Sequence, residues 1–296
     1  MKKNKTMIFL FILPTVLCLL FMYVYPVVRT VIMSFFKVES LTASTSTWSF
    51  YGLQNYFKVL RNAGFISSMK NMVMIWLVGG IITMCLSMLM AVILTSGIRG
   101  AKFFKAAIYM PNIISAAALA TMWIQYVFNY DYGLLNSIIK AVSGIHGPNW
   151  LGDQFWVKVS MIIFMVWKGL GGSIVLYLSG LQSIPRDYYE AAKIDGASGW
   201  RLFRHITLPL VSPVTFYLLI TGLIGGFQVF VEVLVMVPNG GLNYSAATVV
   251  FYMYDKSFGN NQMGYGSAMA FILAILIFIV TAINFKGQDK WVKTIE

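Results

Sequence analysis

Six long apolar runs follow one another along the chain, separated by polar segments. Each run is long enough to form a helix of about 20 residues, the length that crosses the roughly 30 Å hydrocarbon core of a bilayer. The pattern predicts membrane-spanning helices over residues 7–35, 71–95, 104–128, 156–181, 213–236 and 264–285. We therefore expect an all-α integral membrane protein with six transmembrane helices, organised as a single domain over residues 1–296.

The first apolar run follows Lys2, Lys3 and Lys5, as a secretory signal peptide would. It is longer than the apolar region of a signal peptide, contains Pro14 and Pro26, and has no small-residue cleavage site. We expect an uncleaved first span.

Helix-breaking and small residues interrupt three of the runs. Pro111 lies in the third, while glycines cluster in the fourth and fifth: Gly169, Gly171, Gly172, Gly222, Gly225 and Gly226. Small residues let helix backbones approach closely, and breaks are tolerated where they line a cavity. Both ordinary packing and a kinked substrate path remain open.

Composition supports the bilayer as solvent. The 296 residues are 58% hydrophobic and 11% charged, so a soluble domain would expose too much apolar surface. The net charge of +12 does not indicate nucleic-acid binding, because the basic residues flank the apolar runs and form no stripe with aromatic residues.

The basic residues are distributed unequally between the two sets of loops. With the N-terminus inside, the cytoplasmic segments contain Lys2, Lys3, Lys5, Arg99, Lys102, Lys105, Arg186, Lys193, Arg201, Arg204, Lys286, Lys290 and Lys293. The opposite side contains Lys37, Lys58, Arg61, Lys70, Lys140, Lys158 and Lys256. Because cytoplasmic loops are enriched in Lys and Arg, we expect both termini in the cytoplasm.

The side chains needed for metal binding or catalysis do not form recognisable patterns. Cys18 and Cys85 lie within apolar runs, which predicts buried apolar side chains, and His146 and His205 stand in separate loops. The sequence has no G-x-x-x-x-G-K-[ST] motif and no Ser/His/Asp or paired-carboxylate arrangement. We predict no metal site and no catalytic residues.

Three segments on the expected exterior, residues 36–70, 129–155 and 237–262, are rich in aromatic and turn residues, and the second contains an amphipathic stretch over 134–142. Such loops could bind a soluble partner, but they are also expected on any membrane protein.

The polar segment 182–212 predicts two short helices joined by a hinge. Pro185 suits the first turn of a helix, Gly196 can end it in the left-handed conformation, and Ser198 can cap a second helix that Pro209 closes. Tyr188, Ala191 and Ala192 fall on one face of the first helix. That face could dock into a groove of a partner or lie flat at the lipid headgroups.

The residues of this segment also carry a resemblance to a known family. The spacing of Glu190-Ala191-Ala192, Gly196, Ile206, Leu208 and Pro209 resembles the signature loop of permease subunits of bacterial ATP-binding-cassette (ABC) importers, and its surroundings are similar to the carbohydrate-uptake branch for maltose, lactose, raffinose and glycerol-3-phosphate. Motifs along the rest of the chain resemble that branch in the same order: Tyr25-Pro26, Phe103-Phe104, Asp131-Tyr132-Gly133, Trp167-Lys168-Gly169 and Met263-Gly264-Tyr265-Gly266.

The resemblance implies a type I importer permease in the bacterial cytoplasmic membrane. Its implied partners are a second, homologous permease, two ATPase subunits that bind ATP-Mg, and an extracellular substrate-binding protein or lipoprotein that delivers a sugar. This chain itself would hold no cofactor and would not be an enzyme. The residues implied to couple it to the ATPase are Glu190, Ala191, Ala192, Asp195 and Gly196.

Candidate residues for the substrate path lie in the fifth run. Glu232 is the only acidic residue within the six predicted spans, and a carboxylate at that depth faces a cavity or a partner. Relatives more often carry an aspartate at the position of Val231. Phe227 and Phe230 could stack on a sugar ring and Gln228 could bind its hydroxyls, with Asn112 and Lys168 as weaker candidates.

The alternative function is that of a secondary transporter or a channel that works without an ATPase. A secondary transporter would show an inverted repeat and more titratable residues within its spans.

Overall fold

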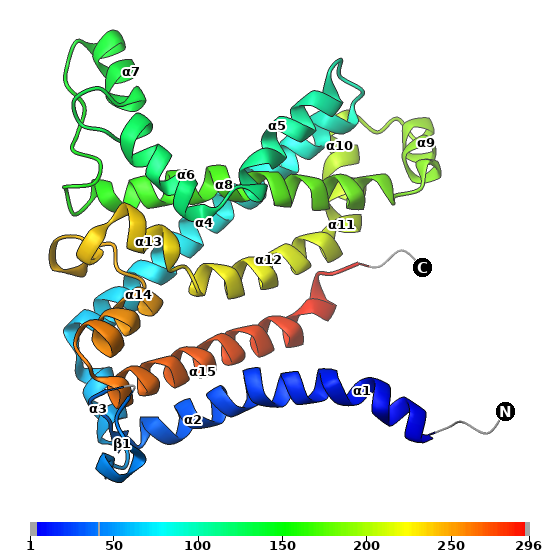
Figure 1. Cartoon of the computed structure of the whole chain (residues 1–296). Coiled ribbons are helices and arrows are strands. Elements are labelled where there is room, and N and C mark those ends of the chain that lie inside the picture. The colour runs from blue at the N-terminus through cyan, green and yellow to red at the C-terminus, as the bar shows by residue number, and fades with distance from the viewer. Residues whose placement is uncertain (1–4, 41, 294–296) are drawn as a thin grey trace. The chain divides into compact units, whose positions relative to one another are not determined.

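The computed structural model describes residues 5–40 and 42–293, and the side chains of Lys5 and Thr6 are not among the described atoms. Lys2 and Lys3, which contribute to the charge argument, lie outside the described residues. Figure 1 shows the labelled elements. The chain divides into two compact units, one formed by residues 1–65 and 253–275 and the other by residues 66–252 and 276–296.

The first unit begins with a long helical segment and contains a small two-stranded ribbon. Its elements are α1 (Lys5–Leu19), the π-helical turn η1 (Leu20–Val24), α2 (Tyr25–Ser34), β1 (Phe36–Lys37), η2 (Thr45–Thr47), β2 (Ser49–Phe50), α3 (Gln54–Arg61), η7 (Asp255–Gly259) and the first half of α15 (Met263–Gly287). The ribbon is antiparallel, with Phe36 opposite Phe50, and is a small departure from the all-α prediction.

Buried polar side chains fix the ribbon to the end of α2. The Asn55 side-chain amide donates to the carbonyl oxygens of Ser34 and Phe36, at 2.9 and 3.0 Å. The Ser34 and Tyr56 hydroxyls lie 2.6 Å apart. Gly264 leaves no room for a side chain, because a Cβ there would meet the carbonyl oxygen of Phe36. The Asn55 amide thus satisfies backbone carbonyl groups at the end of α2 and the start of β1.

The second unit contains most of the long helices. Its elements are the greater part of α4 (Ala63–Thr95), α5 (Ala101–Ile113), α6 (Ala116–Met122), η3 (Trp123–Val127), α7 (Leu134–Ser143), α8 (Trp156–Gln182), α9 (Arg186–Ile194), α10 (Gly199–Leu202), η4 (Phe203–Thr207), α11 (Leu208–Leu210), α12 (Ser212–Phe227), α13 (Val231–Met236), η5 (Pro238–Gly240), η6 (Leu242–Tyr244), α14 (Val249–Tyr254), which runs on into the other unit, the end of α15, and η8 (Gln288–Lys290).

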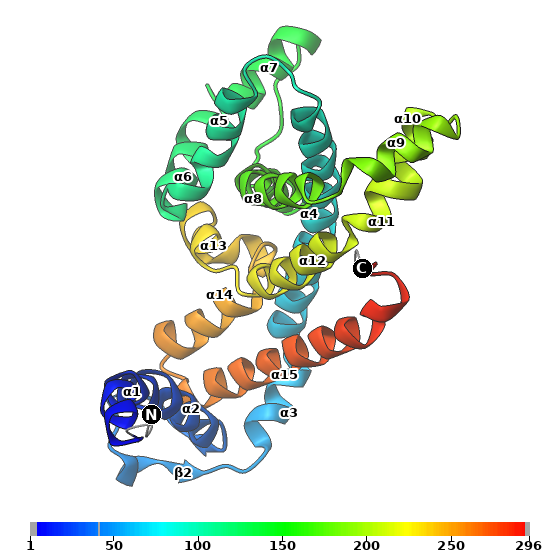
Figure 2. The same ribbon diagram turned by 90° about the vertical axis from the view of Figure 1, so that its right-hand side faces the viewer.

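Helix α8 packs against three other helices of this unit. Figure 2 shows it end-on, with α5, α4 and α12 around it. A Cβ at Gly171 would meet the carbonyl oxygen of Ile108 in α5, and one at Gly180 would meet Val214 in α12. The glycines of the fourth run therefore permit close helix contacts, as small residues do in membrane bundles.

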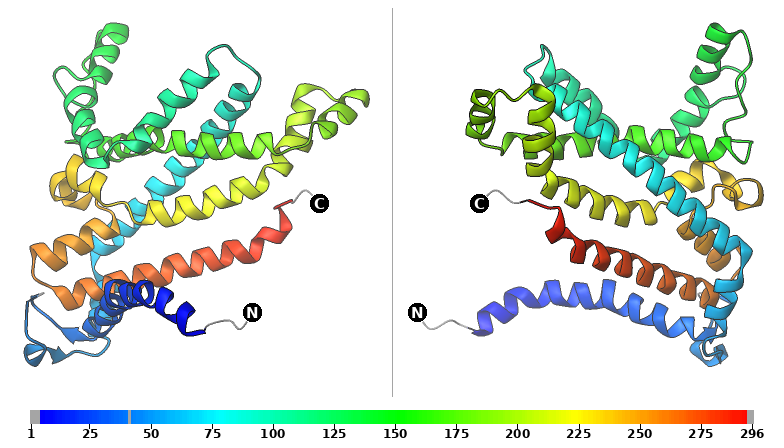
Figure 3. Two further views of the ribbon diagram at one scale, coloured as in Figure 1. Left: turned by 45° about the vertical axis from the view of Figure 1, so that its right-hand side comes forward. Right: turned by 180° about the vertical axis from the view of Figure 1, so that it is seen from behind.

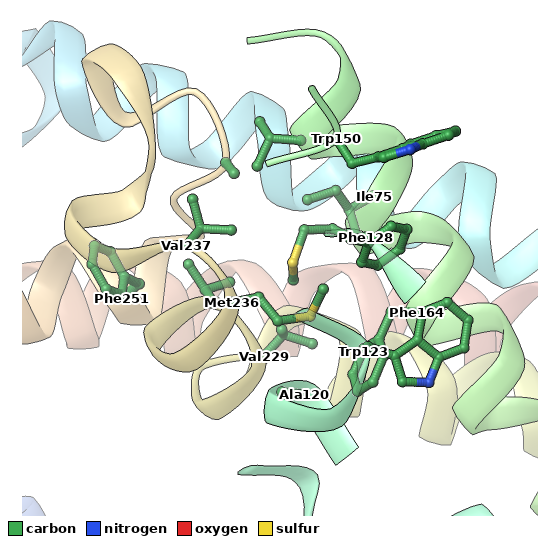
Figure 4. Close-up of a cluster of buried hydrophobic side chains, with 14 of the residues drawn as sticks. Ile75, Ala120, Trp123, Phe128, Trp150, Phe164, Val229, Met236, Val237 and Phe251 are labelled. Carbon is green, nitrogen blue, oxygen red and sulfur yellow. The ribbon is translucent and has the colours of Figure 1, made fainter. Parts of the chain in front are cut away.

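A buried apolar cluster surrounds Trp123, between α6, α8 and the segment around α13 (Figure 4). The Trp123 ring packs edge-on against Phe164, with ring centroids 5.5 Å apart, and also contacts Phe128. A second cluster joins α4, α8 and α12 through Met88, Ile174 and Leu218.

The described residues contain four unbroken helical segments long and apolar enough to cross a membrane: Met7–Ser34, Ala63–Thr95, Trp156–Gln182 and Met263–Lys290. Two bent pairs raise this number to six if each is one span: Ala101–Ile113 with Ala116–Val127, bent by 103°, and Gly199–Leu210 with Ser212–Phe227, bent by 59°. Six spans therefore stay a prediction. Helix α4 begins at Ala63, so it extends about two turns before residue 71, the predicted start of the second span.

The prediction of buried cysteines is wrong for this chain taken alone. Cys18 and Cys85 are both exposed on helix surfaces. An apolar side chain in a membrane protein need not be buried in protein, because lipid is as apolar a solvent as a protein core.

Candidate functional site

The polar segment 182–212 folds as two helical pieces with a left-handed hinge, as predicted. Pro185 is the non-helical residue before α9, and Asp187 lies in its first turn, where a negative charge complements the helix dipole. Gly196 has φ of +76°. The Gly196 N–H donates to the Lys193 carbonyl and the Ala197 N–H to the Ala192 carbonyl, so α9 ends in a Schellman motif.

The second piece agrees closely with the prediction. Ser198 precedes α10, and the helical path continues through η4 and α11. It ends at Leu210, one residue after Pro209. The chain then bends at Val211, where the helical direction changes by 59° before α12.

A side-chain hydrogen bond joins the two pieces. The Tyr189 and Thr207 hydroxyls lie 3.0 Å apart, and Tyr189 also packs against the apolar cluster of α4, α8 and α12. Figures 1 and 3 show α9 and α10 at the end of α8 from which the loop leaves. Tyr189 thus connects α9 both to the second helical piece and to the apolar cluster of α4, α8 and α12.

The outer face of α9 is largely exposed. Glu190, Ala191, Asp195 and Gly196 are exposed, and Ala192 is half-buried. Ile194, beside them at the tip, is 87% exposed. This face has the small, partly apolar character that suits docking into a groove.

A second candidate site lies between α8 and α13. Lys168 Nζ is 2.5 Å from Glu232 Oε1, and the two side chains are 27% and 13% exposed. Glu232 also stands in the first turn of α13. The carboxylate is therefore paired, as opposite charges within a membrane usually are.

Asn112 belongs to the same polar group. Its side-chain amide donates to the carbonyl oxygen of Lys168 at 3.0 Å. The contact is close because Gly171, one turn further along α8, lies directly against α5. The predicted break at Pro111 is displaced: α5 continues to Ile113, and the 103° bend follows before α6.

The fifth run is interrupted beside this ion pair. Helix α12 ends at Phe227 and α13 begins at Val231, so residues 228–230 are not helical. The Thr248 hydroxyl, which is buried, donates to the carbonyl oxygen of Val229 at 2.6 Å. This bond satisfies one backbone group at the break, as non-helical backbone at membrane depth requires.

The aromatic and amide candidates at the break have different surroundings. Gln228 is exposed, whereas Phe230 is half-buried against the Trp123 cluster. Phe227 is 3% exposed and packs edge-on against Trp76, with ring centroids 5.6 Å apart. The structure thus brings Asn112, Lys168 and Glu232 together, with Gln228 at the adjoining break, and directs Phe227 into the protein.

Sequence reasoning missed two features of this site. It did not name Lys168 as the partner of Glu232, although a lone acid within the spans could have been matched with a lysine near the middle of another span. It also missed Thr248, for which the sequence offers no signal, because the residue comes from a distant segment.

Known proteins resemble this chain over nearly its whole length. The family described as "Binding-protein-dependent transport system inner membrane component" matches residues 83–286. The arabinooligosaccharides transport system permease protein AraP of Bacillus subtilis is 32% identical over 96% of this chain and 88% of AraP. The lactose transport system permease protein LacF of Rhizobium radiobacter is 28% identical over 93% of this chain and 92% of LacF. A solved structure is also similar: a crystal structure of a bacterial alginate ABC transporter in complex with an alginate pentasaccharide-bound periplasmic protein. One of its chains matches this chain with a TM-score of 0.84 at 20% sequence identity. The match covers 99% of this chain and 97% of that chain.

Proposed function

This chain belongs to the family of binding-protein-dependent transport system inner membrane components, and we propose that it is the permease subunit of an ATP-driven importer that takes up a sugar, most simply an oligosaccharide. The observation that supports this proposal most strongly is the near-full-length similarity to a permease named for arabinooligosaccharides. In this role the chain supplies half of a path that opens alternately to the two sides of the bacterial cytoplasmic membrane, and a second, homologous permease supplies the other half.

The polar loop is the part that would couple the chain to ATP. Glu190, Ala191, Ala192, Asp195 and Gly196 dock into a cleft of an ATPase subunit, and a pair of such subunits binds ATP-Mg and hydrolyses ATP. The exposed outer face of α9 and the exposed Ile194 support this assignment. The chain itself performs no catalysis.

The polar group between α8 and α13 is the candidate for contact with the sugar. Gln228 and Asn112 can exchange hydrogen bonds with hydroxyls, and Lys168 and Glu232 can open their ion pair to do the same. Phe230 offers a ring face for stacking, while Phe227 supports the break through Trp76. An extracellular binding protein delivers the sugar to this path.

The charge distribution gives the proposed orientation. The charges of Arg186, Lys193, Arg201 and Arg204 support an orientation in which the polar loop and both termini lie in the cytoplasm. The loop then faces the compartment that contains ATP.

The experiment compares two glycines of the loop. A Cβ at Gly196 or at Gly199 would meet nothing within 4 Å, but only Gly196 has a positive φ. An alanine in the left-handed region costs roughly 1–2 kcal/mol. Gly196→Ala should therefore misplace α9 without a clash, while Gly199→Ala serves as the matched control.

The assay is ATP-dependent uptake of arabinooligosaccharides into proteoliposomes that contain this chain with the permease, ATPase and binding protein that co-purify with it. We expect Gly196→Ala to lower uptake several-fold with assembly intact, and Gly199→Ala to leave uptake unchanged. Uptake that continues without any ATPase would overturn the proposal and favour a secondary transporter or a channel.

A further inference from the structure

An apolar groove lies between α4, α8 and the α10–α12 segment. Its volume is about 700 Å³, which falls within the range of roughly 300–1,000 Å³ typical of ligand sites. One face of α4 forms a wall, with Ile81, Cys85, Met88 and Val92 at helical spacing, and Trp200 and Phe203 lie opposite. The groove is distinct from the polar group around Lys168 and from the outer face of α9.

The walls of the groove suit a flexible hydrocarbon chain. Met84 and Met88 on α4 are adaptable side chains that can follow an irregular occupant. Thr215, one of the few polar residues of the lining, donates its hydroxyl to the carbonyl oxygen of Val211 at 3.3 Å and also interacts with the Tyr177 hydroxyl. Both hydroxyls of the lining therefore have partners within the chain.

Trp200 stands at the edge of the groove. It is 68% exposed and stacks on Phe203, with ring centroids 5.6 Å apart and an angle of 29° between the rings. Indole rings with one wet and one apolar side are typical of the boundary between hydrocarbon and lipid headgroups. The edge of the groove therefore has the character of a headgroup boundary.

Positive charge accompanies this edge. Arg201 and Arg204 are exposed on the same short helical path as Trp200, and helical spacing brings Arg204 beside Trp200. No acidic residue occurs in the sequence between Asp195 and Glu232. The charge is thus uncompensated along this segment.

We propose that this groove binds an acyl chain of an anionic phospholipid, whose phosphate is bound by Arg201 and Arg204. Basic groups beside an apolar cleft between transmembrane helices complement both parts of such a lipid. A second membrane protein is a poorer match, because helix contacts in membranes favour small residues, and large apolar side chains predominate in this lining. Lipid binding at this groove does not require that the chain transports a sugar. With the proposed orientation of the polar loop, the lipid belongs to the cytoplasmic leaflet, and only this detail rests on the proposed function.

Quenching of tryptophan fluorescence by brominated lipids tests the proposal. The full-length chain is reconstituted in vesicles that carry brominated acyl chains either on phosphatidylglycerol or on phosphatidylcholine, at equal mole fraction. The contribution of Trp200 is the quenching lost in Trp200→Phe. We expect brominated phosphatidylglycerol to quench Trp200 at lower mole fraction than brominated phosphatidylcholine, and each change of Arg201→Gln or Arg204→Gln to reduce this preference about fivefold. Lys193→Gln, an exposed cation on α9, should leave the preference unchanged.

A second pair of variants tests the groove itself. Cys85→Phe fills part of it and should reduce the quenching of Trp200, whereas Leu86→Phe, which is outside the lining on the same helix, should not. Equal quenching by the two lipids in the wild-type chain would overturn the proposal. Unchanged quenching of Trp200 in a Cys85→Phe variant that retains its helical circular dichroism would overturn it as well. Loss of the quenching when the chain is assembled with the second permease would show that this subunit covers the groove, and would also overturn the proposal. None of these measurements depends on uptake, so the lipid proposal can be refuted while the proposed transport function stands, and the reverse.

Discussion

The ion pair between Lys168 and Glu232 allows a double-mutant cycle. Its N–O distance is 2.5 Å, and the exposures of 27% and 13% place it between surface pairs, worth about 0–1 kcal/mol, and buried pairs, whose disruption costs about 3–5 kcal/mol. We expect Glu232→Gln to lower the free energy of unfolding by about 2–3 kcal/mol, because it leaves the Lys168 charge without a partner. Lys168→Gln should have a similar effect for the same reason.

The double variant removes both charges and should be more stable than the sum of the single effects predicts. A coupling of about 1–2 kcal/mol is expected for residues in direct contact. The assay is unfolding of the purified full chain in detergent, followed by circular dichroism for the four members of the cycle. Lys37 and Glu39 supply a control pair: they lie 2.8 Å apart, but their side chains are 59% and 76% exposed, so their coupling should be too small to measure. Strictly additive effects at Lys168 and Glu232 would refute the reasoning, since they would show that the pair does not stabilise the folded chain.

Two further substitutions test the helix contact and the break described above. Gly171→Ala should destabilise the chain by about 1–3 kcal/mol in the same unfolding assay, because its Cβ would meet the backbone of Ile108, while Gly225→Ala, where a Cβ meets nothing within 4 Å, should have little effect. A neutral Gly171→Ala would mean that α5 and α8 are not held together at this point. Thr248→Val removes the buried hydrogen bond to Val229 and should lower the free energy of unfolding by about 1 kcal/mol. It should also lower uptake more than this loss of stability explains. Wild-type uptake and stability in this variant would show that the bond does not stabilise the break in the helix.

The polar loop could be predicted in detail because its signals are local. Gly196 favours a left-handed stop through its backbone freedom, and it has a positive φ in the structure. Ser198 stands at the predicted helix start, although its side chain makes no capping hydrogen bond there. Pro209 likewise marks the end of the second helical piece to within one residue, since that piece ends at Leu210. The approximate positions of the spans follow from apolar length in the same local way.

The interruptions of the spans could not be predicted because they depend on distant residues. The break after Phe227 is stabilised by Thr248 and by the packing of Phe227 on Trp76, which come from other elements. The bend after Ile113 follows the close contact between α5 and Gly171. Hydropathy records how apolar a residue is, but not which neighbour it meets.

The bend at Val211 makes α12 a lever between the two candidate sites. The helix has 16 residues and is therefore about 24 Å long. One of its ends meets the loop piece that Tyr189 holds through Thr207, and the other ends at the break that precedes Glu232. For a rod of this length, each degree of tilt about Val211 displaces the far end by about 0.4 Å, so a tilt of about 5° moves Phe227 by about 2 Å. A displacement of that size exceeds the tolerance of a hydrogen bond, so a small push on the loop is geometrically sufficient to strain the bond between Thr248 and Val229 and the ion pair beside it.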